Sequence, residues 1–258
     1  KKTLSLGLFL SLTVSIFAQK TEEMKTVWET KLNYEYDLTG LDENLKIIHG
    51  SNEKNFGVLN AEDGSKKWVS KFSEISEDIK KVDLQIPMYE SKAIFLFDKK
   101  MGKDQMVVVD IETGKMLWST GKYQGIEDQD EIVYVPEMDA YAVVTKDALT
   151  MVKARTGEEL WSTKTMNTPV GRYIYDDKEK TITMVNMPRT FLGSLVKGFK
   201  NQILKINVKN GDVIWEQTYR GFIEKKVVTR EPVAHFVLAE GNKLMLQLNG
   251  LQVFDYKT

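Results

Sequence analysis

Residues 106–118, with the sequence MVVVDIETGKMLW, decide the fold of this chain. They begin as a short apolar strand, pass through a polar turn that contains Gly114, and return to Trp118. Glycine supplies a positive φ without a Cβ clash, which a hairpin built on a type I turn with a bulge requires. The stretch therefore predicts a β-hairpin whose second strand carries a tryptophan beside the turn.

The same pattern recurs at residues 56–68, 149–161 and 203–215, and the segment 251–258, LQVFDYKT, matches its beginning. Tryptophans at 28, 68, 118, 161 and 215 are separated by 40, 50, 43 and 54 residues. That period is typical of a four-stranded propeller blade. The alternating apolar residues predict strands with one buried face. Glycine precedes tryptophan by four residues in four pairs: Gly64 and Trp68, Gly114 and Trp118, Gly157 and Trp161, and Gly211 and Trp215.

This repeat resembles the tryptophan-docking motif of pyrroloquinoline-quinone (PQQ) propellers, A-x-D-x-x-T-G-x-x-x-W. The resemblance implies a divergent member of the PQQ-like repeat family in the quinoprotein alcohol dehydrogenase-like superfamily. The fold expected is all-β, a β-propeller of four-stranded antiparallel blades, with about five blades present. We expect each tryptophan ring to cover the glycine of its own repeat and to pack against the next repeat. Asn60, Asp110 and Asn207 occupy or replace the motif aspartate, and their side chains are expected to hydrogen-bond the turn backbone.

Two arrangements of the repeats remain open. In one, the strand around Trp28 completes the blade begun by residues 251–258 and closes a ring of five blades. In the other, which we favour because the motif stops in mid-turn at Thr258, the chain belongs to a larger ring of seven or eight blades.

Residues 1–18 have the basic, apolar and small-residue order of a secretory signal peptide. The apolar run is shorter than the roughly 20 residues that span a bilayer, so we expect cleavage after Ala18 and a periplasmic or secreted bacterial protein that does not cross the membrane. Residues 19–258 would form the propeller domain. The absence of cysteine excludes disulfides and a lipidated cysteine, and the net charge of −1 gives no reason to expect nucleic-acid binding.

Two long spacings contain insertions. Ile75, Ile79 and Val82 lie at helical intervals within residues 72–87, which predicts a short helix that caps a blade. The second insertion, residues 188–201, gathers five apolar residues that form either a partner surface or the cover of a blade: Phe191, Leu192, Leu195, Val196 and Phe199.

No catalytic residue, cofactor-binding residue or metal ligand is predicted. His49 and His235 are far apart in the sequence, and no motif of a hydrolase or nucleotide-binding protein is present. The sequence contexts that hold PQQ and calcium in the dehydrogenases of this family have no match here. The leading hypothesis is a non-catalytic, monomeric scaffold that binds a protein partner in the cell envelope. The alternatives are a PQQ-dependent oxidoreductase whose site is completed beyond residue 258, and a sensor propeller for a small molecule or glycan.

Overall fold

The computed structural model describes residues 25–30, 37–127, 129–144, 148–163, 170–186, 202–218, 236–240, 243–247 and 251–255. Within these ranges the regular structure is β-sheet, apart from three short helical turns: α1 (Phe72–Ile75), η1 (Gln129–Glu131) and η2 (Pro136–Met138). None of the helices in these ranges has the length and apolarity needed to cross a bilayer.

The strands form successive antiparallel sheets in which sequential strands are neighbours. The first sheet contains β1 (Asp37–Asp42), β2 (Ile47–Ser51), β3 (Asn55–Asn60) and β4 (Lys66–Lys71), and the second contains β5 (Leu84–Met88), β6 (Ala93–Asp98), β7 (Gln105–Asp110) and β8 (Met116–Thr120). The third contains β9 (Ile132–Val135), β10 (Ala140–Val144), β11 (Leu149–Lys153) and β12 (Glu159–Thr163). The fourth contains β13 (Val170–Asp176), β14 (Thr181–Asn186), β15 (Gln202–Asn207) and β16 (Val213–Thr218), and the last contains β17 (Phe236–Glu240), β18 (Lys243–Gln247) and β19 (Leu251–Asp255).

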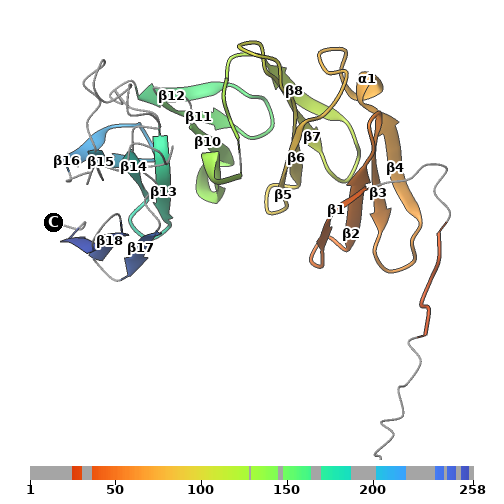
Figure 1. Cartoon of the computed structure of the whole chain (residues 1–258), viewed down its shortest axis with the longest axis horizontal. Helices are drawn as coiled ribbons and strands as arrows, with labels where there is room; N and C mark the ends of the chain where they lie inside the picture. The colour runs from red at the N-terminus through yellow and green to blue at the C-terminus, as the bar shows by residue number, and fades with distance from the viewer. Residues whose placement is uncertain are drawn as a thin grey trace, which may run out of the picture.

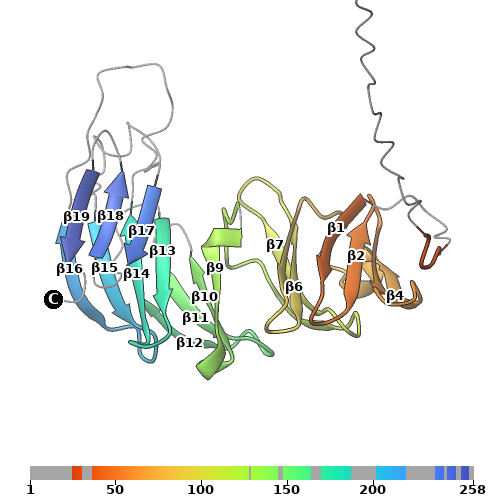
Figure 2. The same cartoon turned by 90° about the horizontal axis from the view of Figure 1, so that it is seen from below.

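These sheets are the blades of a β-propeller and follow one another around an open arc (Figure 1). Turned by 90°, the arc is a shallow band in which β13 to β19 lie at one end and β1 to β4 at the other (Figure 2). The prediction of an all-β propeller with four-stranded antiparallel blades is confirmed. The segment 25–30 lies at the β4 end, far from β17 and β18.

The middle strands of the blades are buried on both faces, so the prediction of a single buried face is wrong. In β7, Met106, Val107, Val108 and Val109 are all fully buried. Met106 and Val108 pack toward the third blade, whereas Val107 and Val109 pack toward the first. A strand that lies between two other sheets needs apolar residues on both faces, and this requirement produces continuous apolar runs rather than alternation.

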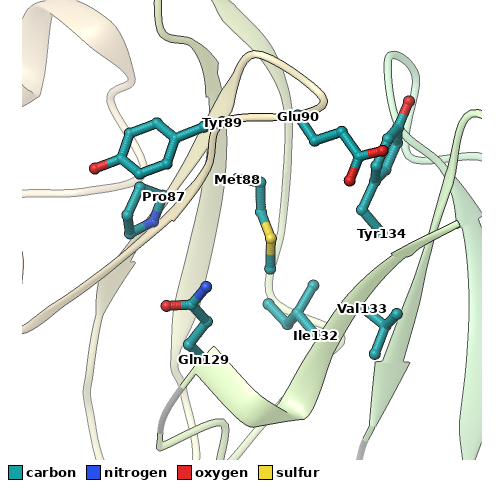
Figure 3. Close-up of a pocket in the computed structure, with 8 residues that line it drawn as sticks. All are labelled: Pro87, Met88, Tyr89, Glu90, Gln129, Ile132, Val133 and Tyr134. Carbon is teal, nitrogen blue, oxygen red and sulfur yellow. The ribbon is translucent and has the colours of Figure 1, made fainter. Parts of the chain in front are cut away.

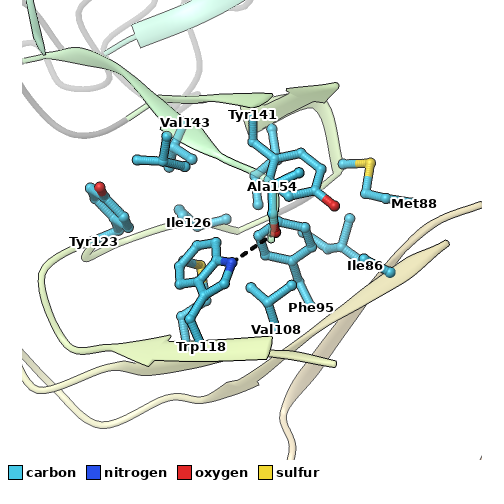
Figure 4. Packing of buried hydrophobic residues seen from close by; sticks show 14 of the residues in the cluster. Ile86, Met88, Phe95, Val108, Trp118, Tyr123, Ile126, Tyr141, Val143 and Ala154 are labelled. Atoms are coloured by element: carbon cyan, nitrogen blue, oxygen red, sulfur yellow. Dashed lines mark hydrogen bonds between the residues drawn. The ribbon is translucent and has the colours of Figure 1, made fainter. Parts of the chain in front are cut away.

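The hydrophobic core is divided into clusters that lie between neighbouring blades. The cluster between the second and third blades includes Phe95 and Trp118 from one side and Tyr141 and Val143 from the other (Figure 4). Phe95 meets Tyr141 edge to face, with ring centroids 4.8 Å apart. Since each cluster needs residues from two repeats, a single blade does not bury its own apolar surface.

The insertion after β4 is helical for one turn only. The α1 helix spans four residues and ends at Ile75, earlier than the spacing of the apolar residues predicted. Ile75 and Ile79 are buried, and Val82 packs beside them in the cluster between the first and second blades. The apolar positions of this insertion therefore cover a blade, as expected, but without a continuous helix.

Candidate functional site

Each motif glycine lies beneath the tryptophan of the preceding repeat. A Cβ built on Gly114 would lie 2.6 Å from the Trp68 ring, and one on Gly157 would lie 2.6 Å from the Trp118 ring. The same relation holds between Gly64 and Trp28 and between Gly211 and Trp161. Each of these rings packs against the next repeat, as expected, but it covers the glycine of that repeat, so the prediction that it covers its own glycine is wrong.

The indole nitrogen repeats this contact as a hydrogen bond. Trp118 Nε1 donates to the Ala154 carbonyl oxygen at 2.9 Å (Figure 4). Three other indoles make matching bonds of 2.8 to 3.0 Å to the carbonyl oxygen of the residue that follows the motif Asp or Asn position: Trp28 to Ala61, Trp68 to Ile111 and Trp161 to Val208. The Trp215 Nε1 is buried and has no such acceptor among the described residues. The ring and the turn are thus fixed by both packing and a directed polar contact across each of these blade interfaces.

The residue that accepts the indole hydrogen bond is itself held by a second turn of the same blade. The Ala154 amide donates to the carbonyl oxygen of Asp139, which has a φ of +44° and lies between the first and second strands of its blade. Three lysines with φ between +51° and +55° take the same position in the other blades: Lys46, Lys92 and Lys180. Sequence reasoning missed these residues because none of them is a glycine, although residues other than glycine adopt this conformation infrequently.

The motif turns have the predicted chemistry where the sequence keeps the motif. Gly114 has a φ of +73°, and its amide donates to the Asp110 carbonyl oxygen at 2.8 Å. The Asp110 carboxylate accepts hydrogen bonds from the Glu112 and Thr113 amides, and Asn60 and Asn207 accept one amide each, which confirms their expected role. Lys153 replaces the acid in the third blade, and its ammonium instead pairs with Glu158 at 2.5 Å.

Polar side chains add a further link between the second and third blades. Arg155 donates to the Asp110 carboxylate at 3.1 Å and to the Ser91 carbonyl oxygen at 3.0 Å. The Ser91 hydroxyl is 2.6 Å from the hydroxyl of Tyr141, and burial raises the pKa of Tyr141 to about 12. The interface between the second and third blades is therefore held by polar contacts at the turns as well as by apolar packing in its middle.

A groove opens between the first strands of these two blades, β5 and β9. Its volume is about 410 Å³. Met88 and Ile132 lie at its centre and Val133 beside them, while Pro87 and Tyr89 line the β5 side (Figure 3). The side chain of Gln129 lines one end. The groove thus combines an apolar floor with a few polar groups, which is the composition of a binding site for an organic ligand or a side chain.

Acidic and phenolic groups occupy the other end of the groove. Glu90 extends toward the ring of Tyr134 (Figure 3). The Tyr134 hydroxyl donates to Asp139 at 2.9 Å. Burial, this hydrogen bond and the negative charges of Asp139 and Glu90 raise the pKa of Tyr134 to about 12. Glu90 itself is exposed and makes no ion pair with any described side chain. An unpaired carboxylate therefore stands beside an aromatic face.

His49 lies at the neighbouring interface, between the first and second blades. It is buried in β2, and its Nε2 is 2.7 Å from the Tyr89 hydroxyl. Burial lowers the pKa of His49 to about 4. The imidazole is therefore neutral at physiological pH and has a structural position. No group of three or more potential metal ligands gathers among the described residues.

The predicted partner surface lies outside the described residues. This applies to Phe191, Leu192, Leu195, Val196 and Phe199, and to His235 and the signal sequence. The structure therefore places the glycine and tryptophan pairs of the repeat but does not describe the apolar loop or the leader.

Blades joined by a tryptophan on the next turn define a PQQ-like β-propeller. A family model described as outer membrane protein assembly factor BamB matches residues 13–227. The chain belongs to this family.

Several solved structures are similar to this chain at low sequence identity. A crystal structure of the eukaryotic initiation factor is 10% identical, with a TM-score of 0.58. The match covers 87% of this chain and 52% of the chain in that structure. The quinohemoprotein alcohol dehydrogenase ADHIIG from Pseudomonas putida HK5 is 14% identical, with a TM-score of 0.51, and covers 89% of this chain and 42% of its own. BamB from Moraxella catarrhalis is 13% identical, with a TM-score of 0.45, and covers 83% of this chain and 56% of its own.

The chain spans about half the length of these structures. No curated protein matches its sequence.

Proposed function

We propose that this chain is a non-catalytic propeller of the bacterial cell envelope, where it binds protein partners during outer-membrane assembly. The observation that carries the proposal is the match of residues 13–227 to the model of an outer membrane protein assembly factor. Fold similarity to an alcohol dehydrogenase does not imply its activity, because the propeller scaffold supports unrelated functions. The signal peptide at residues 1–18, with cleavage after Ala18, supports an envelope location and forms part of the proposal.

Two features of the described blades support a binding role. Tryptophan contacts fix the three successive interfaces from the first blade to the fourth. The inner strands are therefore carried on a rigid scaffold. The groove between β5 and β9 is open and lined by both apolar and polar groups. Rigid scaffolds that present adaptable surface features are suited to protein recognition.

The test is association with the assembly machinery of the source organism. The full chain, expressed with its own leader and a C-terminal tag, should be recovered from the periplasm without residues 1–18, as measured by intact mass. Its isolation after in vivo photo-crosslinking should yield outer-membrane assembly proteins. Recovery only from the cytoplasm, or tight binding of PQQ with calcium followed by dye reduction with an alcohol, would contradict the proposal.

A further inference from the structure

The groove between β5 and β9 is formed by two strands that both lie at the edge of their sheets. In the described sheets β5 pairs only with β6, and β9 pairs only with β10. Edge strands carry backbone groups that can pair with an added strand. Pro87 lies within β5 and has no N–H, so β9 provides the fuller set of backbone partners on this groove. This geometry favours an extended polypeptide over a compact small molecule.

The floor of the groove favours aliphatic chains. Met88 and Ile132 are buried and face each other across the gap between the blades (Figure 3). Met88 is unbranched and adapts to differently shaped ligands, and its sulfur is polarizable. The aliphatic stem of a long side chain can therefore be buried here while its tip reaches toward the end of the groove.

The end of the groove favours a cation. Glu90 offers a carboxylate without an ion-pair partner among the described side chains, and it stands next to the ring of Tyr134. The nearby basic groups are already engaged, since Arg155 pairs with Asp110 and Lys92 pairs with Glu112. Besides burial and its hydrogen bond to Asp139, the charge of Glu90 contributes to the raised pKa of Tyr134, so the negative field of Glu90 reaches the ring at this end of the groove. An ammonium or guanidinium group between a carboxylate and an aromatic face gains both Coulomb and cation–π attraction.

We infer that the groove between β5 and β9 binds an extended segment of a partner protein through one lysine or arginine side chain, whose stem lies on Met88 and Ile132 and whose cation lies between Glu90 and Tyr134. This inference rests on the proposed function and names the chemistry by which a partner is recognised. The residues that form the groove are different from those of the apolar insertion at residues 188–201.

The experiment uses the full chain with its methionine methyl groups labelled with ¹³C, and Met88→Leu assigns the Met88 signal. The probe is the peptide acetyl-Gly-Leu-Lys-Leu-Gly-amide, and the matched peptide has norleucine in place of lysine. We expect the lysine peptide to shift the Met88 methyl signal in a saturable way, with at least a tenfold weaker effect of the norleucine peptide. Glu90→Gln should weaken binding of the lysine peptide about fivefold, which is the upper range for an exposed ion pair. Glu43→Gln, which removes another exposed carboxylate, should bind like the unmodified chain.

A Met88 signal that does not respond to the lysine peptide would overturn the inference, as would equal binding by Glu90→Gln and the unmodified chain. Equal binding of n-butylamine would also overturn it, because a free amine lacks the peptide backbone. Failure of the proposed function can be distinguished from failure of this inference. A chain that binds the peptide but crosslinks to no envelope protein keeps the groove and loses the function. A chain that crosslinks equally with and without Glu90→Gln keeps the function and loses the groove.

Discussion

Replacing Gly157 by alanine tests whether tryptophan packing joins the blades. The new Cβ would lie 2.6 Å from the Trp118 ring, well inside van der Waals contact, on a residue whose φ is +70°. The left-handed backbone alone costs alanine about 1 to 2 kcal/mol, offset by roughly 0.4 to 1 kcal/mol from the less flexible unfolded chain. Displacing the indole adds about 1 kcal/mol for its hydrogen bond to Ala154 and about 1 to 2 kcal/mol for lost packing. We expect a total loss of about 3 kcal/mol.

Gly102→Ala is the matched control, because Gly102 has the same φ of +70° but no atom within 4 Å of the built Cβ. It should cost only about 1 kcal/mol, the backbone share. Urea denaturation followed by near-ultraviolet circular dichroism measures both losses. In a Trp118→Ala background the cost of Gly157→Ala should fall to that of Gly102→Ala, since the clash is gone. Equal costs of Gly157→Ala and Gly102→Ala in the unmodified chain would refute the tryptophan contact as the reason for glycine.

Three other outcomes are expected. Trp118→Ala should lower the free energy of unfolding by about 3 to 5 kcal/mol, because a buried aromatic leaves a cavity between two blades; an unchanged denaturation midpoint would contradict this. His49 is protonated below about pH 6.5 in the unfolded chain but only below about pH 4 in the folded chain, where burial lowers its pKa. The free energy of unfolding should therefore fall by about 3 kcal/mol from pH 7 to pH 4. The fall should be smaller in His49→Gln. Phe191→Ser combined with Phe199→Ser should abolish crosslinking to envelope proteins with little change in melting temperature if the loop is a partner surface; a collapse of the melting temperature would identify a blade cover instead.

The sequence predicts the hairpin of each repeat because its signals are local. Gly114 needs a positive φ and Asp110 needs nearby amides, and both requirements are met within one turn. The partner of Trp68 could not be predicted in this way, because Gly64 and Gly114 offer the same chemistry and only the assembled blades select between them. Strand burial was misjudged for the same reason, since the second buried face exists only when another sheet covers it.

The groove between β5 and β9 could not be predicted from the sequence. Glu90 and Tyr134 are 44 positions apart, and each is an ordinary residue in its own segment. They become a pair because the first strands of two blades meet there. Lys92 and Asp139 occupy equivalent turns of successive blades. A structural alignment of the repeats on these two residues is the signal that relates the segments containing Glu90 and Tyr134.

The one-repeat offset between tryptophan and glycine determines which pieces of the gene can be duplicated without damage. A copy that runs from the first to the fourth strand of a blade brings a turn that accepts the tryptophan before it and a tryptophan that fits the turn after it. In its tryptophan and glycine contacts such a copy, inserted for example after β8, is compatible with both of its new neighbours, so whole blades can be gained or lost without redesign of these contacts. A recombination point between Gly114 and Trp118 would instead separate the two strands of a hairpin and disturb two interfaces at once.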